Sequence, residues 1–144
     1  MEEQQQYGER GAEGSVGPTV YHIDSRVSLI ELIAAAAHQA NRAYCIALDD
    51  ISQPVWEDAP EWQRSSACNG VKAALDPDQT PEKSHEGWLK QKTEEGWRWG
   101  PVKDPELKLH PCFLPYGDLP ADQRLKDDIF LTTVRSIAKA VGIL

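Results

Sequence analysis

Residues 85–116 have the sequence HEGWLKQKTEEGWRWGPVKDPELKLHPCFLPY, and they carry the strongest structural signals of the chain. The first third of this stretch is polar apart from Trp88 and the leucine that follows it. Thr80 and Pro81 precede this part, and they suit the N-cap and the first position of a helix. The charged run stops at Gly96, and glycine commonly ends helices in a left-handed conformation. We therefore expect a helix that begins after Thr80 and ends just before Gly96.

The remainder of this stretch is unsuited to a helix because prolines interrupt it, at Pro101, Pro105, Pro111 and Pro115. Trp97-Arg98-Trp99 alternates like a short strand, and we expect Phe113-Leu114 to pair with it.

Three further segments show apolar residues at helical spacing, and they are about Ser28–Leu48, Asp58–Leu75 and Pro120–Val141. Asp58 is expected to cap the second of them, with Pro60 in its first turn. No internal repeat is visible. The fold prediction is a mainly α unit of about four helices with a short two-stranded β element.

Residues 1–20 differ in composition from the rest of the chain. They hold Tyr7, Val16, Val20 and a few alanines among many Glu, Gln and Gly residues. Such a stretch buries too little apolar surface to offset the entropy of ordering. We expect a disordered acidic, Gln- and Gly-rich tail over 1–20 and a single domain over 21–144.

The net charge of −8 argues against a nucleic-acid polymer as partner, because an acidic chain repels the phosphate backbone. No run approaches the roughly 20 apolar residues that span a bilayer, so no membrane is expected. The acidic start lacks the basic region of a secretory signal. Three scattered cysteines suit buried apolar positions, and together these features favour the cytoplasm.

Sequence patterns of known catalytic sites are absent: there is no nucleophile elbow, zinc-protease helix, phosphate-binding loop, dinucleotide fingerprint or paired-cysteine knuckle. His38, His85 and His110 could assemble a site with Cys68 or Cys112, but nothing in their spacing indicates one. We expect no enzyme, no metal and no cofactor.

The tryptophans are the unusual feature, since the chain has five of them. For Trp62 and Trp97 core packing is the ordinary interpretation, because indoles are large hydrophobes that anchor small domains. Trp88 lies on a very polar segment, so it is either the packing anchor of its helix or a partly exposed surface for stacking a flat base. These alternatives stay open.

Basic residues gather near Trp88 in an otherwise acidic chain, at Lys90, Lys92, Arg98, Lys103, Lys108 and His110. Cations beside an aromatic face would suit the phosphate of a stacked nucleotide. The alternative is that Lys90 and Lys92 balance Glu94 and Glu95 on the surface.

Several short motifs occur in a fixed order: His85-x-x-Trp88, then Gly96-Trp97-Arg98-Trp99-Gly100-Pro101-Val102-Lys103-Asp104, then Lys108-x-His110-Pro111-Cys112, then Pro115-Tyr116-x-x-Leu119-Pro120, with His38-x-x-Asn41-Arg42-x-Tyr44 upstream. Over about residues 28–140 this pattern resembles the RyR domain, the repeat found in the cytoplasmic shell of ryanodine receptor channels. Free-standing copies occur in bacteria and phages. Trp99 departs from the channel repeats, which usually carry Tyr there.

The resemblance implies a unit that binds a ligand and does not catalyse. In paired channel repeats an adenine nucleotide stacks between the two tryptophans that correspond to Trp88, so a homodimer or higher homo-oligomer could supply the second ring here. The implied pocket would be lined by His85, Trp88, Trp99, Tyr44, Asn41 and Arg42, with Lys92, Lys103 or His110 meeting phosphate.

The expected function is non-enzymatic binding of an adenine-containing nucleotide or a cyclic nucleotide immune signal. By analogy with phage-type sponges, such a domain would sequester a defence second messenger in the host cytoplasm. The alternative is a protein–protein interaction or structural module with no small-molecule ligand.

Overall fold

The computed structural model describes residues 27–144, so the tail expected over 1–20 lies outside the described residues. The described part has four α-helices, α1 (Leu29–Ala47), α2 (Glu61–Ala74), α3 (Pro81–Glu94) and α4 (Ala121–Ala140). Two one-turn 3₁₀ helices, Trp56–Asp58 and Tyr116–Asp118, lie in the connections. The predicted mainly α fold is confirmed.

Side-chain caps begin two of the helices. Ser28 Oγ accepts a hydrogen bond from the Glu31 N–H at 3.1 Å, and Thr80 Oγ1 accepts one from Lys83 N–H at 3.2 Å. The predicted Thr80 cap is therefore confirmed. Asp58 was wrongly predicted to cap α2, because the residue before a proline is driven out of the helical region. Ala59 and Pro60 are extended, and they separate Asp58 from the first turn of α2.

The small sheet joins β1 (Arg98–Trp99) and β2 (Leu109–His110) in parallel, with Arg98 opposite Leu109 and Trp99 opposite His110. The predicted pairing with Phe113-Leu114 was wrong. Those two backbone N–H groups close turns, donating to His110 O at 3.2 Å and to Cys112 O at 2.8 Å.

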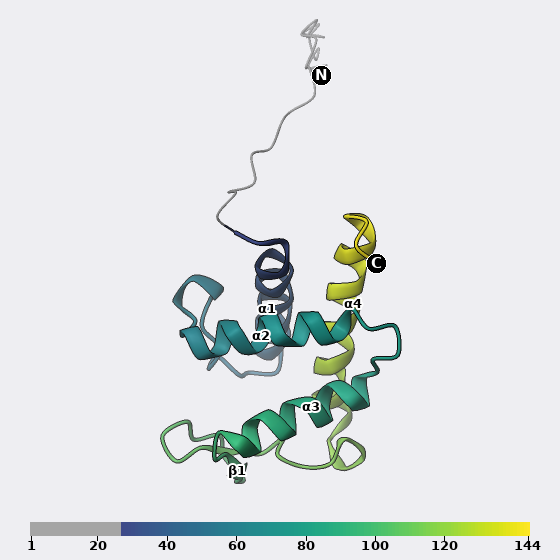
Figure 1. Cartoon of the computed structure of the whole chain (residues 1–144). Helices are drawn as coiled ribbons and strands as arrows, with labels where there is room; N and C mark the ends of the chain where they lie inside the picture. Colours follow the sequence, from purple (N-terminus) through teal and green to yellow (C-terminus); the bar gives the residue numbers. More distant parts are fainter. Residues whose placement is uncertain (1–26) are drawn as a thin grey trace, which may run out of the picture.

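Three helices build the core, and α1 and α4 run alongside each other while α2 crosses them (Figure 1). The alanines of α1 permit this close approach. The buried core residues are Ile33, Ala34, Ala37, Val71, Ala74, Leu131 and Val134. Helix α3 packs outside this core against α4 and α2, with β1 at its far end. No helix within 27–144 has both the length and the apolar character needed to cross a membrane.

Candidate functional site

Trp88 lies in the middle of a row of rings that belong to its own domain. Its ring centroid is 5.6 Å from that of His85, which is stacked on it, and 5.0 Å from that of His110, which meets it edge-on. Phe113 lies at 5.9 Å. The indole is half-buried as a result. Trp88 therefore anchors α3 to the loop after β2, and only part of its surface is left for a ligand.

His85 is buried and fastens the loop before the second 3₁₀ helix to α3. Its Nε2 lies 2.7 Å from Leu114 O, and because a carbonyl oxygen only accepts, this nitrogen carries the hydrogen. Its Nδ1 is 3.8 Å from Asp127 Oδ2. Burial, followed by the charge of Asp128, raises the pKa of Asp127 to about 7. Near neutral pH this carboxyl is therefore protonated in a large share of molecules.

Lys92 lies one turn beyond Trp88 and is only 5% exposed. Its Nζ lies over the Trp62 ring, 4.6 Å from the centroid, and over the Trp97 ring at 5.7 Å. The same ammonium donates to Glu95 Oε2 at 2.8 Å. The predicted phosphate ligand Lys92 is thus held between two indoles and a carboxylate of the same chain.

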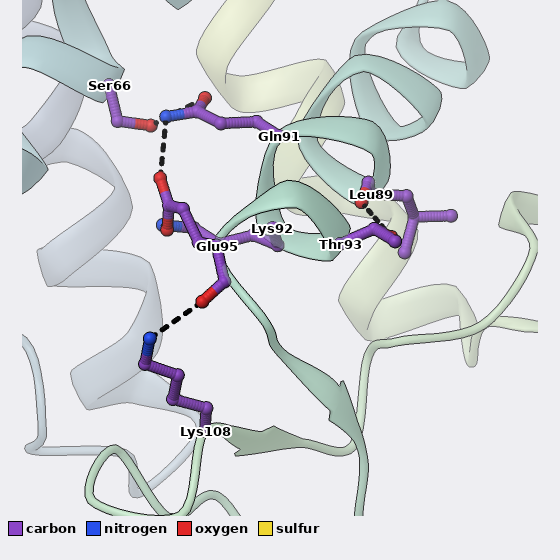
Figure 2. A network of polar contacts seen from close by, with 7 residues as sticks. All are labelled: Ser66, Leu89, Gln91, Lys92, Thr93, Glu95 and Lys108. Atoms are coloured by element: carbon purple, nitrogen blue, oxygen red, sulfur yellow. Dashed lines mark hydrogen bonds and ion pairs between the residues drawn. The ribbon is translucent and has the colours of Figure 1, made fainter.

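Glu95 organises the polar contacts at the end of α3 (Figure 2). Its Oε1 accepts from Gln91 Nε2 at 3.2 Å, and Gln91 Oε1 accepts from Ser66 Oγ of α2 at 3.2 Å. Lys108 Nζ donates to the backbone oxygen of Glu95 at 2.7 Å. The hydrogen bond from Lys92 is the main cause that lowers the pKa of Glu95, so this carboxyl is ionised at neutral pH.

A pocket of about 320 Å³ opens beside this network, lined by Trp62, Glu95, Trp97, Pro105 and Lys108. Trp62 is 53% exposed, so its predicted place in the core was wrong. Trp62 and Val71 are nine positions apart, which at about 100° per residue is roughly half a turn around the helix. The polar neighbours of Trp62 on that face, Ser66 and Asn69, were the signal in the sequence that this side faces outward.

A second hollow of about 340 Å³ lies where α4 begins, lined by Tyr116, Ala121, Arg124, Leu125 and Asp128. It offers one aromatic ring and one guanidinium. The Trp62–Trp97 pocket is the better candidate site because it offers two rings on one hollow.

His110 was predicted to meet phosphate as a cation. Burial, followed by the positive charges of Lys103 and Lys126, lowers the pKa of His110 to about 4. Its Nδ1 accepts a hydrogen bond from the Cys112 N–H at 3.0 Å, which also requires an unprotonated nitrogen. At neutral pH His110 is therefore neutral, and its ring packs against Trp88 and Trp97.

Lys103 is half-buried near the end of α1, where Nζ donates to Ser52 Oγ at 3.1 Å. Burial lowers the pKa of Lys103, and the charge of Asp50 opposes this effect. The positive charge of Lys126 on α4 also lowers the pKa values of Asp50, Lys103 and His110. Sequence patterns did not indicate that Lys126 and Asp50 would lie here, because four distant segments meet at this point.

The remaining predicted residues have other neighbours. Tyr44 donates from its hydroxyl to Asp122 O at 2.8 Å, and Arg42 Nε donates to Gln53 O at 3.2 Å. Both contacts tie α1 to its surroundings, and Asn41 is half-buried on the same helix.

Trp99 is 53% exposed on β1 and lines neither of the two pockets described above. The structure thus brings His85, Trp88 and His110 into one row, and it does not gather the predicted set into one pocket. Within 27–144, no three His, Cys, Asp or Glu side chains are placed to hold a metal ion.

Comparison with known families identifies a match in the second half of the chain. Residues 76–142 match the family model described as RyR domain. The matched segment contains α3, the sheet and α4, and with them Trp88 and four of the five pocket residues, whereas Trp62 on α2 lies outside it. The match shows an RyR domain over residues 76–142.

Proposed function

We propose that this domain binds a nucleotide-derived small molecule in the Trp62–Trp97 pocket without catalysing a reaction. The ligand would be an adenine-containing nucleotide or a cyclic nucleotide signal. The observation that carries the proposal is that two tryptophans line one hollow together with Lys108. A base stacked on an aromatic side chain gains about 1–3 kcal/mol, and a nearby lysine suits its phosphate.

The size of the pocket agrees with this ligand class. Small-molecule sites range over roughly 300–1,000 Å³, and a pocket of about 320 Å³ lies at the lower end of that range. Such a space suits one base with its sugar and phosphate. A larger cyclic nucleotide would place one base in the pocket and the rest over the surrounding surface.

Trp88 offers a second place for the same ligand. The family resemblance predicts a base stacked between the Trp88 rings of two copies, and the indole is only half-buried, which supports some contact there. Three rings of its own domain already pack against it. We therefore favour the Trp62–Trp97 pocket, which one copy forms alone.

Calorimetric titration with ATP, cyclic ADP-ribose isomers and cyclic dinucleotides tests the proposal. Trp62→Ala should weaken binding about tenfold or more, as expected from the loss of one stacking partner. Trp99→Ala is the matched control, because Trp99 is equally exposed but lies outside the pocket.

Trp88→Phe distinguishes the two locations. Binding should be lost in this variant only if the base is clamped between the Trp88 rings of two copies. Failure of every ligand to bind the folded protein would contradict the proposal. If a defence signal binds, sequestration in the cytoplasm is the role we propose, and co-expression with the enzyme that makes the signal would test it.

One observation favours the alternative, a protein–protein interaction module. Ile51 and Val102 are 85% and 73% exposed apolar side chains, and they adjoin in sequence the two partners of the Lys103–Ser52 hydrogen bond. Under this alternative, Ile51→Ser with Val102→Ser should dissolve an oligomer seen by sedimentation velocity. A monomeric parent protein would remove this support for self-association.

A further inference from the structure

Pockets walled by two indoles ordinarily attract cations. The face of an indole carries negative electrostatic potential, and cages of aromatic side chains bind quaternary ammonium groups for this reason. Taken alone, Trp62 and Trp97 could therefore take a cationic ligand as readily as a nucleotide.

In this chain the cation position beside the two rings is already filled. The Lys92 ammonium reaches from α3 and lies over both indoles, 4.6 Å and 5.7 Å from their centroids. Lys92 is buried, and its bond to Glu95 keeps the ammonium in place. The indole faces that Lys92 covers are therefore already occupied by a cation, and a second cation cannot use them.

The carboxylate in the pocket wall does not reverse this effect. Glu95 Oε2 accepts from Lys92 and Oε1 accepts from Gln91, so both oxygens already have donors within the protein. The Lys92 ammonium and the Glu95 carboxylate together carry no net charge.

Lys108 adds a second positive charge beside Glu95. Its backbone has φ 54, a left-handed conformation that costs a non-glycine residue energy, and the side chain reaches back to the end of α3. One N–H of its ammonium donates to Glu95 O. An ammonium has three donors, so Lys108 can also meet an anionic group of a ligand.

We infer that the Trp62–Trp97 pocket selects planar ligands that carry negative charge and rejects planar cations, with Lys92 as its built-in cation and Lys108 as the group that meets the anion. This inference rests on the ligand pocket proposed above. It names the charge that the ligand must carry there.

Three probes with the same ring system but different charge test the inference: adenosine, AMP and 1-methyladenosine, which is cationic at neutral pH. At low ionic strength AMP should bind about two- to fivefold more tightly than adenosine, the range expected for one exposed ion pair. 1-Methyladenosine should bind more weakly than adenosine. Added salt should reduce both differences.

Lys108→Met should bring the affinity for AMP down to that for adenosine, and Lys108→Arg should keep the difference. Lys90→Met is the control, since Lys90 is an exposed lysine of α3 that does not line the pocket. If the three probes bind the parent protein equally, the inference is overturned while nucleotide binding stands. If none binds the folded protein, the proposed function itself fails.

Discussion

Replacing Lys92 with Met removes the ammonium between the two indoles but keeps most of the buried stem. The variant loses two cation–π contacts, with Trp62 and Trp97, each worth about 0.5–2 kcal/mol depending on desolvation. It also loses the charged hydrogen bond to Glu95, worth about 1.5–3 kcal/mol. Relief from burying the charge offsets part of this loss. Glu95 is 36% exposed and can be rehydrated. We expect the free energy of unfolding to fall by about 2 kcal/mol.

Urea unfolding followed by circular dichroism measures this change, with Lys90→Met as the control on the same helix. Lys90 is exposed and should give a change within about 0.5 kcal/mol. The double variant with Glu95→Gln should lose less than the sum of the two single variants, because the residues contact each other. Equal effects of Lys92→Met and Lys90→Met would refute the description of Lys92 as a caged cation.

Three further predictions concern titration and packing. Asp127 has a folded-state pKa of about 7 against an ordinary 3.8, so its contribution to stability is largest at acid pH and falls as the pH rises from 4 to 7. This pKa difference corresponds to a change of at most about 4 kcal/mol in the free energy of unfolding, and partial solvation of Asp127 should reduce the change to about 1–2 kcal/mol. Asp127→Asn should remove this fall in a comparison of unfolding at pH 5 and pH 8, and parallel pH profiles for the two proteins would contradict it. Because burial lowers the pKa of His110 to about 4, NMR spectra of its ring should show a neutral imidazole down to about pH 5. The stability that neutral His110 contributes should be lost as the pH falls toward 4. A titration midpoint near pH 6.5 would contradict the burial of this ring. Gly100→Ala would place a Cβ 2.7 Å from Leu109 Cβ and should lower stability by about 1–3 kcal/mol, whereas Gly117→Ala meets nothing within 4 Å and should be near neutral in thermal unfolding.

Local sequence signals predicted the helices well. Thr80 and Pro81 begin α3 as expected, and Gly96, with φ 87, follows its end. These features depend on contacts within a few residues, which the sequence displays directly. The Asp58 cap failed because the neighbouring Pro60 imposed an extended backbone that outweighed the preference of an aspartate for a cap.

The site was harder to predict because it depends on how distant elements pack. The Trp62–Trp97 pocket exists only because α2 lies against the end of α3, and a left-handed Lys108 returns the chain to that end. Lys92 was predicted to meet phosphate or, alternatively, to balance Glu94 and Glu95, and the sequence did not show that two indoles from other segments would cover it. The sequence identified the aromatic and basic residue types, while their grouping came from the tertiary fold.

The five indole N–H signals of ¹⁵N-labelled protein can show whether the Trp62–Trp97 pocket holds the ligand. Each signal can be assigned with a single Trp→Phe variant, and AMP is then titrated in. We predict that the Trp62 and Trp97 signals shift together with one saturation curve while the Trp99 signal stays in place. Shifts confined to Trp88 and Trp99, or no shift at all with folded protein, would contradict binding in this pocket.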